Sequence, residues 1–259
     1  MELLSFQALG AEIRGCLQED YDTLAAHKVR PALVICPGGA YRWRSPREKD
    51  PPALEFLSMG YQVFILEYSC GDQAGEYHPL RELAETVRVL REHHEAWHID
   101  PGKIAVLGFS AGGHLAASLG ALWNDPELGL PSDSRPDALV LCYPVVSTRE
   151  FAHGESVQWV TGGDGALLEK LHIPGRVTGA FPPTFLWHGG EDGSVPPENS
   201  LMLAAELRRH GVPFELHLFE TGGHGLSTCT LEVETPDEVC RAWLSLCKTW
   251  LNRRFRYVP

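Results

Sequence analysis

Short apolar runs rich in strand-forming residues alternate with stretches of helical periodicity along most of this chain. The predicted strands are residues 32–36, 61–68, 103–109, 138–143, 184–188 and 214–219. The predicted helices are residues 52–59, 80–97, 111–122, 199–210 and 237–253. Strands that alternate with helices build βαβ units. The pattern therefore predicts an α/β fold with a mainly parallel central sheet and helices on both faces.

One stretch interrupts this alternation. Residues 147–180 are mixed in composition and include the glycine-rich sequence Gly162-Gly163-Asp164-Gly165. Because no Lys-Ser/Thr follows these glycines, we interpret them as a flexible turn rather than a phosphate loop. We expect residues 147–180 to be an insertion that covers the sheet as a small cap. No linker or repeat divides the rest of the chain, so residues 1–259 are predicted to form a single α/β domain.

Charge and cysteine content argue against several functional classes. The chain has 22 Lys and Arg against 34 Asp and Glu, a net charge of −12, and no basic block that would favour nucleic acid or an anionic membrane. It has no apolar run long enough to span a bilayer, and its first residues lack the pattern of a signal peptide. The seven cysteines are an odd number without a Cys-x-x-Cys pair, which predicts reduced thiols in a cytoplasmic protein.

The sequence Gly108-Phe109-Ser110-Ala111-Gly112 has the form G-x-S-x-G and lies between a predicted strand and a predicted helix. A sharp turn at this position exposes the serine hydroxyl, and the glycines leave room for the helix to cross the sheet. The helix N-terminus below the serine would favour a developing oxyanion. We therefore predict that Ser110 is a nucleophile.

A serine hydroxyl needs a base, and the base needs an acid that orients it. The strand at 184–188 is followed by Glu191 and Asp192, and the strand at 214–219 is followed by His224 in a glycine-flanked loop. The order Ser, acid, His is typical of one large hydrolase fold. We predict His224 as the base and Asp192 as its acid, with Glu191 as the alternative.

Backbone N–H groups are the expected donors to the oxyanion. One belongs to Ala111, the residue after the nucleophile. The others should come from the turn after the first predicted strand, where Gly39 and Ala40 are the candidates. An ordinary Gly-Gly turn is the alternative interpretation of that segment.

His94-Glu95-Ala96-Trp97-His98 matches the zinc motif H-E-x-x-H. The predicted helix stops almost at once at Asp100-Pro101, and no third ligand follows on an adjoining helix. We therefore interpret these residues as the solvated end of a helix and expect no metal and no organic cofactor.

These motifs resemble the α/β-hydrolase superfamily. PGGAYRW (37–43), GFSAGGHLA (108–116), HGGEDGSVPPENS (188–200) and GGHGLS (222–227) occur in the order found there, and the resemblance covers the chain from about residue 31 to its last helix. The group most similar is that of small acetyl esterases and lipase-like carboxylesterases, including acetylxylan esterases. Many relatives have a third glycine where this chain has Ala40, whose methyl group should narrow the site.

The resemblance implies Ser110, Asp192 and His224 as a catalytic triad, and short-chain esters, acetyl above all, as small-molecule substrates. The alcohol would be a sugar or another small alcohol. Two other readings remain open: a serine peptidase or amidase on the same fold, and a binding protein that keeps the fold without catalysis. Tyr41, Trp43 and His153 either contact substrate or pack against the insertion.

Overall fold

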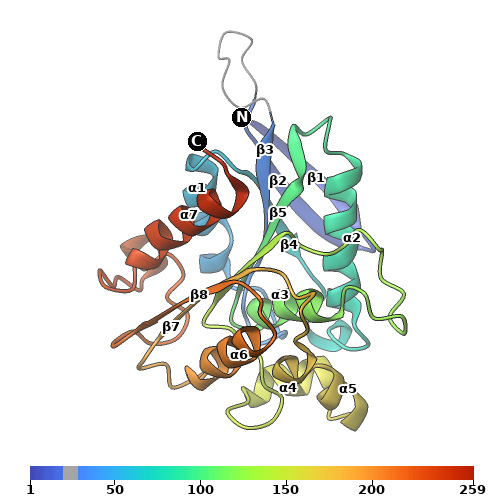
Figure 1. Cartoon of the computed structure of the whole chain (residues 1–259), viewed down its shortest axis with the longest axis vertical. Helices are drawn as coiled ribbons and strands as arrows, with labels where there is room; N and C mark the ends of the chain where they lie inside the picture. The colour runs from blue at the N-terminus through green and yellow to red at the C-terminus, as the bar shows by residue number, and fades with distance from the viewer. Residues whose placement is uncertain (20–28) are drawn as a thin grey trace.

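A computed structural model describes residues 1–19 and 29–259 of the chain (Figure 1). These residues contain one eight-stranded sheet in the order β1-β2-β4-β3-β5-β6-β7-β8. The strands are β1 (Glu2–Ala8), β2 (Ala11–Leu17), β3 (Arg30–Cys36), β4 (Gln62–Glu67), β5 (Ile99–Phe109), β6 (Ala138–Cys142), β7 (Thr184–Gly189) and β8 (Phe214–Phe219). Strands β3 to β8 pair in parallel, which confirms the predicted sheet.

Helices cover both faces of the sheet (Figure 1). One face carries α2 (His78–Glu92), α3 (Ala111–Leu122) and α6 (Glu198–Arg209), and the other carries α1 (Asp50–Ser58) and α7 (Ala242–Phe255). Alternate side chains of β5 supply both layers, because Val106 packs in the first apolar cluster and Leu107 in the second. A strand buried on both faces is apolar throughout, as the sequence of β5 is from Ile104 onward.

The N-terminal hairpin of β1 and β2 is absent from the predicted elements. β1 and β2 pair antiparallel, and β2 joins β4 in the same antiparallel sense at the edge of the sheet. The side chains of β2 alternate between buried and more exposed, with Ala11, Ile13 and Leu17 facing inward. This period of two is the signal that would have identified the strand.

Two predicted boundaries around the fifth strand are wrong. The helix predicted over 80–97 ends at Glu92, and residues 93–98 form turns in which His93 stacks on Trp97 and His98 has a φ of 52°. The strand that follows begins at Ile99, which pairs with Arg30, and so it starts earlier than the predicted Lys103. The next pair is Ala32 with Ile104, and the Pro-Gly sequence lies in the register shift between these two pairs.

The H-E-x-x-H sequence therefore lies in turns and not on a helix. His94, Glu95 and His98 all come after the last residue of α2. In the parts of the chain that the structure describes, no group of three His, Cys, Asp or Glu side chains is arranged to hold a metal ion.

The last helix also begins later than the predicted residue 237. The side chain of Asp237 accepts a hydrogen bond from the N–H of Cys240 at 2.8 Å, and this closes a separate turn before α7 starts at Ala242.

All seven cysteines lie in the described residues and are free thiols. Among those residues, the structure contains no helix with the length and apolar character needed to cross a membrane.

Residues 147–180 contain two short helices, α4 (Gly154–Thr161) and α5 (Gly165–Lys170), and a 3-10 turn, η3 (Ile173–Arg176). The glycine-rich sequence is the turn between α4 and α5, with Gly162 in the left-handed conformation and Asp164 as the N-cap of α5. The segment lies beneath α3 and α6 at the bottom of Figure 1.

Candidate active site

Ser110 is the single residue between β5 and α3, and its backbone has φ 52° and ψ −116°. Such a conformation in a non-glycine residue costs on the order of 1–3 kcal/mol and persists only where the surroundings impose it. The N–H of Ser110 donates to the carbonyl of Cys142 at 3.0 Å, and its carbonyl accepts from the N–H of Val145 at 3.1 Å. β6 and the chain after it therefore hold the serine in the turn.

Gly112 explains why the turn needs glycine. A Cβ at this position would collide with the carbonyl oxygens of Cys36 and Pro37 at the end of β3. The first turn of α3 can approach β3 this closely only when no side chain intervenes.

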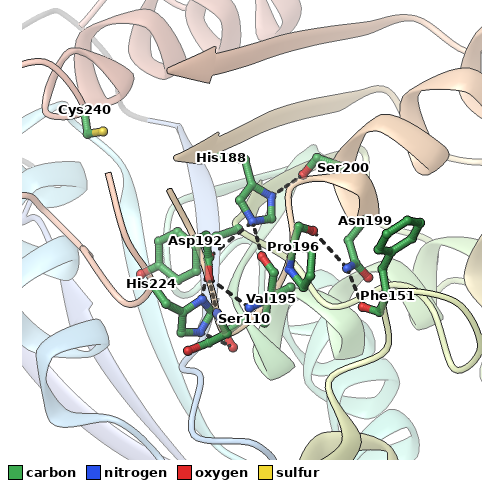
Figure 2. Close-up of polar contacts among 12 residues, drawn as sticks. Ser110, Phe151, His188, Asp192, Val195, Pro196, Asn199, Ser200, His224 and Cys240 are labelled. Carbon is green, nitrogen blue, oxygen red and sulfur yellow. Dashed lines mark hydrogen bonds and ion pairs between the residues drawn. The ribbon is translucent and has the colours of Figure 1, made fainter. Parts of the chain in front are cut away.

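His224 connects the serine to an acid (Figure 2). It lies in the loop after β8, and its Nε2 is 2.9 Å from Oγ of Ser110. Its Nδ1 is 2.7 Å from Oδ2 of Asp192. Because a carboxylate only accepts, Nδ1 carries the proton in the neutral ring, and Nε2 is left to accept the hydroxyl proton of Ser110.

Asp192 follows β7 and is 4% exposed. Its Oδ1 accepts hydrogen bonds from the N–H groups of Ser194 at 3.0 Å and Val195 at 2.8 Å, so Oδ2 is directed at the histidine. Glu191, the alternative acid, is exposed to solvent. The structure thus brings Asp192, and not Glu191, to His224.

His188, the penultimate residue of β7, is a further partner of the acid. Its Nε2 lies 2.9 Å from the Val195 carbonyl and 3.2 Å from Oδ2 of Asp192, while Nδ1 is 2.8 Å from Oγ of Ser200. Two acceptors around Nε2 assign the proton to that nitrogen. Burial by itself raises the pKa of Asp192, but hydrogen bonds from His188 and His224 outweigh it and hold the pKa well below its ordinary value.

The expected oxyanion donors lie beside the serine. Gly39 has φ 121°, and a side chain at this position would also collide with the Trp43 carbonyl. In the described part of the chain, the N–H groups of Gly39 and Ala40 donate no hydrogen bond. Ala111 is the first residue of α3, so its N–H has no partner within the helix. Three N–H groups are therefore available to an anion.

A cavity of about 290 Å³ opens above Ser110 and His224. Gly39, Ala40, Trp43, Arg47, His153 and Ser194 are among the residues that line it. Trp43 is 54% exposed, whereas Tyr41 and Tyr68 are buried in the core. Of the two aromatic side chains at the start of the segment after β3, Trp43 lines the cavity and Tyr41 packs in the core.

His153 brings the insertion to this cavity. It is the N-cap of α4, where its Nδ1 accepts from the N–H of Ser156. Burial lowers the pKa of His153 below its ordinary value, and the nearby His224 lowers it further. A neutral ring whose Nδ1 is an acceptor carries its proton on Nε2.

Asn199, at the start of α6, joins the insertion to the acid loop, residues 190–197 between β7 and α6 (Figure 2). Its Oδ1 accepts from the N–H groups of Val146 and Ser147, and its Nδ2 donates to the carbonyls of Phe151 and Pro196. All four hydrogen-bonding positions of the amide are thus used within one buried junction.

His114 joins α3 to both the first loop and the insertion. Its Nδ1 is 2.9 Å from the Tyr41 hydroxyl, and its Nε2 is 3.0 Å from the Leu171 carbonyl. A carbonyl oxygen only accepts, so Nε2 carries the proton and the tyrosine hydroxyl donates to Nδ1. Burial lowers the pKa of His114 to about 4.

This low pKa predicts a loss of stability in acid. Between pH 6.5 and about 4 the unfolded chain binds a proton at His114 that the folded chain does not, so the free energy of unfolding falls as pH falls. The expected loss is on the order of 3 kcal/mol. Denaturant unfolding of wild type and His114→Asn across this range should show a steeper decline for wild type. Parallel declines would contradict the assignment.

Four residues around the site were not predicted from the sequence: His188, Asn199, and the hydrogen-bonded pair of Glu48 and Tyr143, whose hydroxyl donates to Oε1 of Glu48 at 2.7 Å. The first two stand within HGGEDGSVPPENS, so their closeness to Asp192 along the chain was a usable signal. Glu48 and Tyr143 meet only through the fold, because they are 95 positions apart.

A serine in a strand-to-helix turn, an acid after β7 and a histidine after β8 meet at the edge of a mostly parallel sheet. This arrangement defines the α/β-hydrolase class. Two family models match the chain: BD-FAE over residues 21–138 and the prolyl oligopeptidase family over residues 168–247.

Individual proteins support the same placement. An acetyl ester-xyloside bifunctional hydrolase from Caldicellulosiruptor lactoaceticus is 36% identical, with a TM-score of 0.83 over 96% of this chain and 90% of that one. Endo-1,4-β-xylanase B of Butyrivibrio fibrisolvens is 32% identical over 78% of this chain and 33% of its own length. An acetylxylan esterase of Xylanibacter ruminicola is 28% identical over 75% of this chain and 40% of its own.

The chain belongs to the α/β-hydrolase superfamily, in the group that includes acetyl esterases and carboxylesterases. It spans about a third of the xylanase and two fifths of the acetylxylan esterase.

Proposed function

We propose that this protein hydrolyses carboxylic esters through a covalent acyl-enzyme. The observation that carries the proposal is the continuous hydrogen-bonded path from Ser110 through His224 to Asp192, with distances of 2.9 and 2.7 Å. The esterase names of the relatives support the same reaction.

In the first half of the reaction, Oγ of Ser110 attacks the ester carbonyl and Nε2 of His224 takes the hydroxyl proton. Asp192 stabilises the imidazolium that forms and holds the ring in its tautomer. The N–H groups of Gly39, Ala40 and Ala111 bind the oxyanion. Collapse of the tetrahedral intermediate expels the alcohol, which receives the proton from His224. Water then attacks the acyl-enzyme with His224 as base again, and the acid product leaves.

The substrates we propose are esters of short acyl groups, acetyl above all, on a sugar or another small alcohol. A cavity of about 290 Å³ is at the small end for ligand pockets. Ala40 lines this cavity, and the exposed ring of Trp43 offers a surface on which a sugar could stack. Two relatives are named for xylose-based substrates.

Initial rates on p-nitrophenyl acetate, butyrate, octanoate and decanoate test this preference. We expect kcat/KM to fall by at least about 10-fold from acetate to decanoate, since each methylene group that does not fit the pocket costs binding. Faster hydrolysis of decanoate than of acetate would refute the short-acyl proposal.

A peptidase or amidase activity is the second candidate. Residues 168–247, which include Asp192 and His224, match the prolyl oligopeptidase family, and this match favours a peptidase activity. Release of p-nitroaniline from a dipeptidyl anilide, measured beside the ester series, distinguishes the two reactions. Labelling of Ser110 by a fluorophosphonate without hydrolysis of any ester would favour the amide substrate.

We further propose that residues 147–180 act as a cap within a single domain. His153 at the cavity and the Asn199 junction support this role.

The net charge of −12 supports a small-molecule partner over nucleic acid or a membrane, and the free thiols support a cytoplasmic location.

A further inference from the structure

A second carboxylate is buried close to the site, and the triad does not use it. Glu48, the last residue of the 3-10 turn η1 (Pro46–Glu48), is 2% exposed. Among the ion pairs of the described residues, none involves Glu48. Its Oε2 accepts from the N–H of Gly38 at 2.8 Å, and its Oε1 accepts from the hydroxyl of Tyr143 at 2.7 Å. Burial raises the pKa of Glu48, and these two hydrogen bonds oppose the rise.

One of these bonds is made with the oxyanion loop, the segment after β3 that contains Gly39 and Ala40. Gly38 is the residue immediately before Gly39, and its N–H is fixed by Glu48. A Cβ on Gly38 would lie 2.7 Å from Oε2 of Glu48 and 3.0 Å from Cβ of Ser110. The carboxylate and the nucleophile are therefore both packed directly against this glycine. A small rotation of the Gly38 peptide would turn the next N–H groups away from the serine.

The other bond is made with Tyr143, whose ring contacts His224. Tyr143 follows β6, and its ring meets the ring of His224 edge to face, with centroids 5.1 Å apart and an interplanar angle of 69°. The Tyr143 hydroxyl also accepts from the N–H of Ser227 at 2.9 Å, three residues beyond the histidine. Because this hydroxyl accepts from Ser227, its own proton is free to go to Glu48.

We propose that Glu48 is a positioning residue that aligns the oxyanion loop and the His224 loop for catalysis. The inference rests on the proposed esterase function of the same site. One carboxylate accepts from both loops at once, directly from Gly38 and through Tyr143 from Ser227. Glu48 also lines the cavity beside Ser110 and His224, but its hydrogen bonds go to Gly38 and Tyr143, so it acts through these two groups. Burying a carboxylate costs free energy unless its oxygens receive hydrogen bonds. The Gly38 N–H and the Tyr143 hydroxyl are therefore held where they can donate to Glu48.

Glutamine tests this role because it has nearly the same shape. Its amide has one acceptor oxygen and one NH₂ donor group, so it can accept from Gly38 or from Tyr143 but not from both at one oxygen each. Tyr143→Phe is the complementary change, because it keeps the ring against His224 and removes only the hydroxyl. Glu82→Gln is the matched control. Glu82 is also a buried carboxylate, which accepts from the N–H of Ser69 at 2.7 Å, outside the active-site cavity.

The experiment measures kcat and KM on p-nitrophenyl acetate and the inhibition constant of a trifluoromethyl ketone. Oγ of Ser110 adds to the ketone carbonyl carbon, the hydroxyl proton of Ser110 passes to Nε2 of His224, and the carbonyl oxygen becomes a tetrahedral oxyanion that binds to the same donors. We expect Glu48→Gln to lower kcat about 10- to 100-fold while KM stays within about 3-fold of the wild-type value. The inhibition constant of the ketone should rise by a factor similar to the fall in kcat. Tyr143→Phe should lower kcat about 10-fold. Glu82→Gln should leave kcat within about 2-fold, whatever it does to the melting temperature.

Equal kcat and ketone affinity in wild type and folded Glu48→Gln would overturn the inference while leaving the esterase proposal intact. If Glu48→Gln does not fold, Tyr143→Phe decides, and an unchanged kcat there would equally overturn it. A fall in kcat of the same size in Glu82→Gln would mean that the loss of any buried carboxylate lowers activity, and it would overturn the positioning role of Glu48. Wild-type protein without esterase activity would overturn the proposed function, and this inference with it.

Discussion

Replacing Ser110 with alanine should lower kcat on p-nitrophenyl acetate by about 10⁴-fold or more. The alanine variant keeps the cavity and the oxyanion donors but has no atom that can form the acyl-enzyme. Removal of the nucleophile from a triad leaves only the catalysis that binding and oxyanion stabilisation provide. Initial rates at saturating substrate measure the effect, and a fluorophosphonate probe should label wild type and not the variant.

Ser134→Ala is the control for this prediction. Ser134 is another buried serine, and its hydroxyl has no hydrogen-bond partner among the described residues. This variant should keep kcat within about 2-fold, because surface and structural changes away from the site leave the reacting groups in place. Activity that survives in Ser110→Ala would mean that another group attacks the ester.

Replacing Asp192 with asparagine should lower kcat by about 10⁴-fold. The amide can present an NH₂ group to Nδ1 of His224, which favours the tautomer with the proton on Nε2. A ring protonated there cannot accept the proton of Ser110. The substitution also removes the charge that stabilises the imidazolium, and it places a donor beside His188 Nε2 or beside the N–H groups of the acid loop.

Glu191→Gln separates this effect from a general loss of charge. Glu191 is adjacent in sequence but exposed, so its replacement should change kcat by less than about 2-fold. If Glu191→Gln were inactive and Asp192→Asn active, Glu191 would be the acid despite its position in this structure. Urea unfolding of both variants identifies any loss that comes from instability.

The strands and helices could be predicted where the local pattern is strong. α3 and β8 have the predicted bounds because glycine, charge or proline ends their apolar periodicity. The errors lie where tertiary contacts outweigh local preference. β5 begins at Ile99 because Arg30 of β3 supplies a partner there, with the Pro-Gly pair in the register shift that follows. The stacking of His93 on Trp97 accompanies the early end of α2.

The candidate site divides in the same way. Ser110, Asp192 and His224 are recognisable because each follows a strong strand in a short glycine-containing loop, and parallel strands deliver such loops to one edge of the sheet. The structure places the three within hydrogen-bond distance, and their catalytic roles stay predictions that the variants above test. The sequence favoured Asp192 over Glu191, and the structure adds the contacts that separate them: Oδ1 of Asp192 accepts from the N–H groups of Ser194 and Val195, and Oδ2 faces His224.

The sequence by itself therefore determined the fold class, the order of nucleophile, acid and base, and the loops that carry them. These depend on the periodicity and residue types of short segments. Only the tertiary structure decided that His188 supports the acid, that His153 faces the cavity, and that Glu48 joins Gly38 to Tyr143. The physical reason is that a buried polar group takes its partners from whichever segments the packed sheet places around it, and those segments can be far apart in the chain.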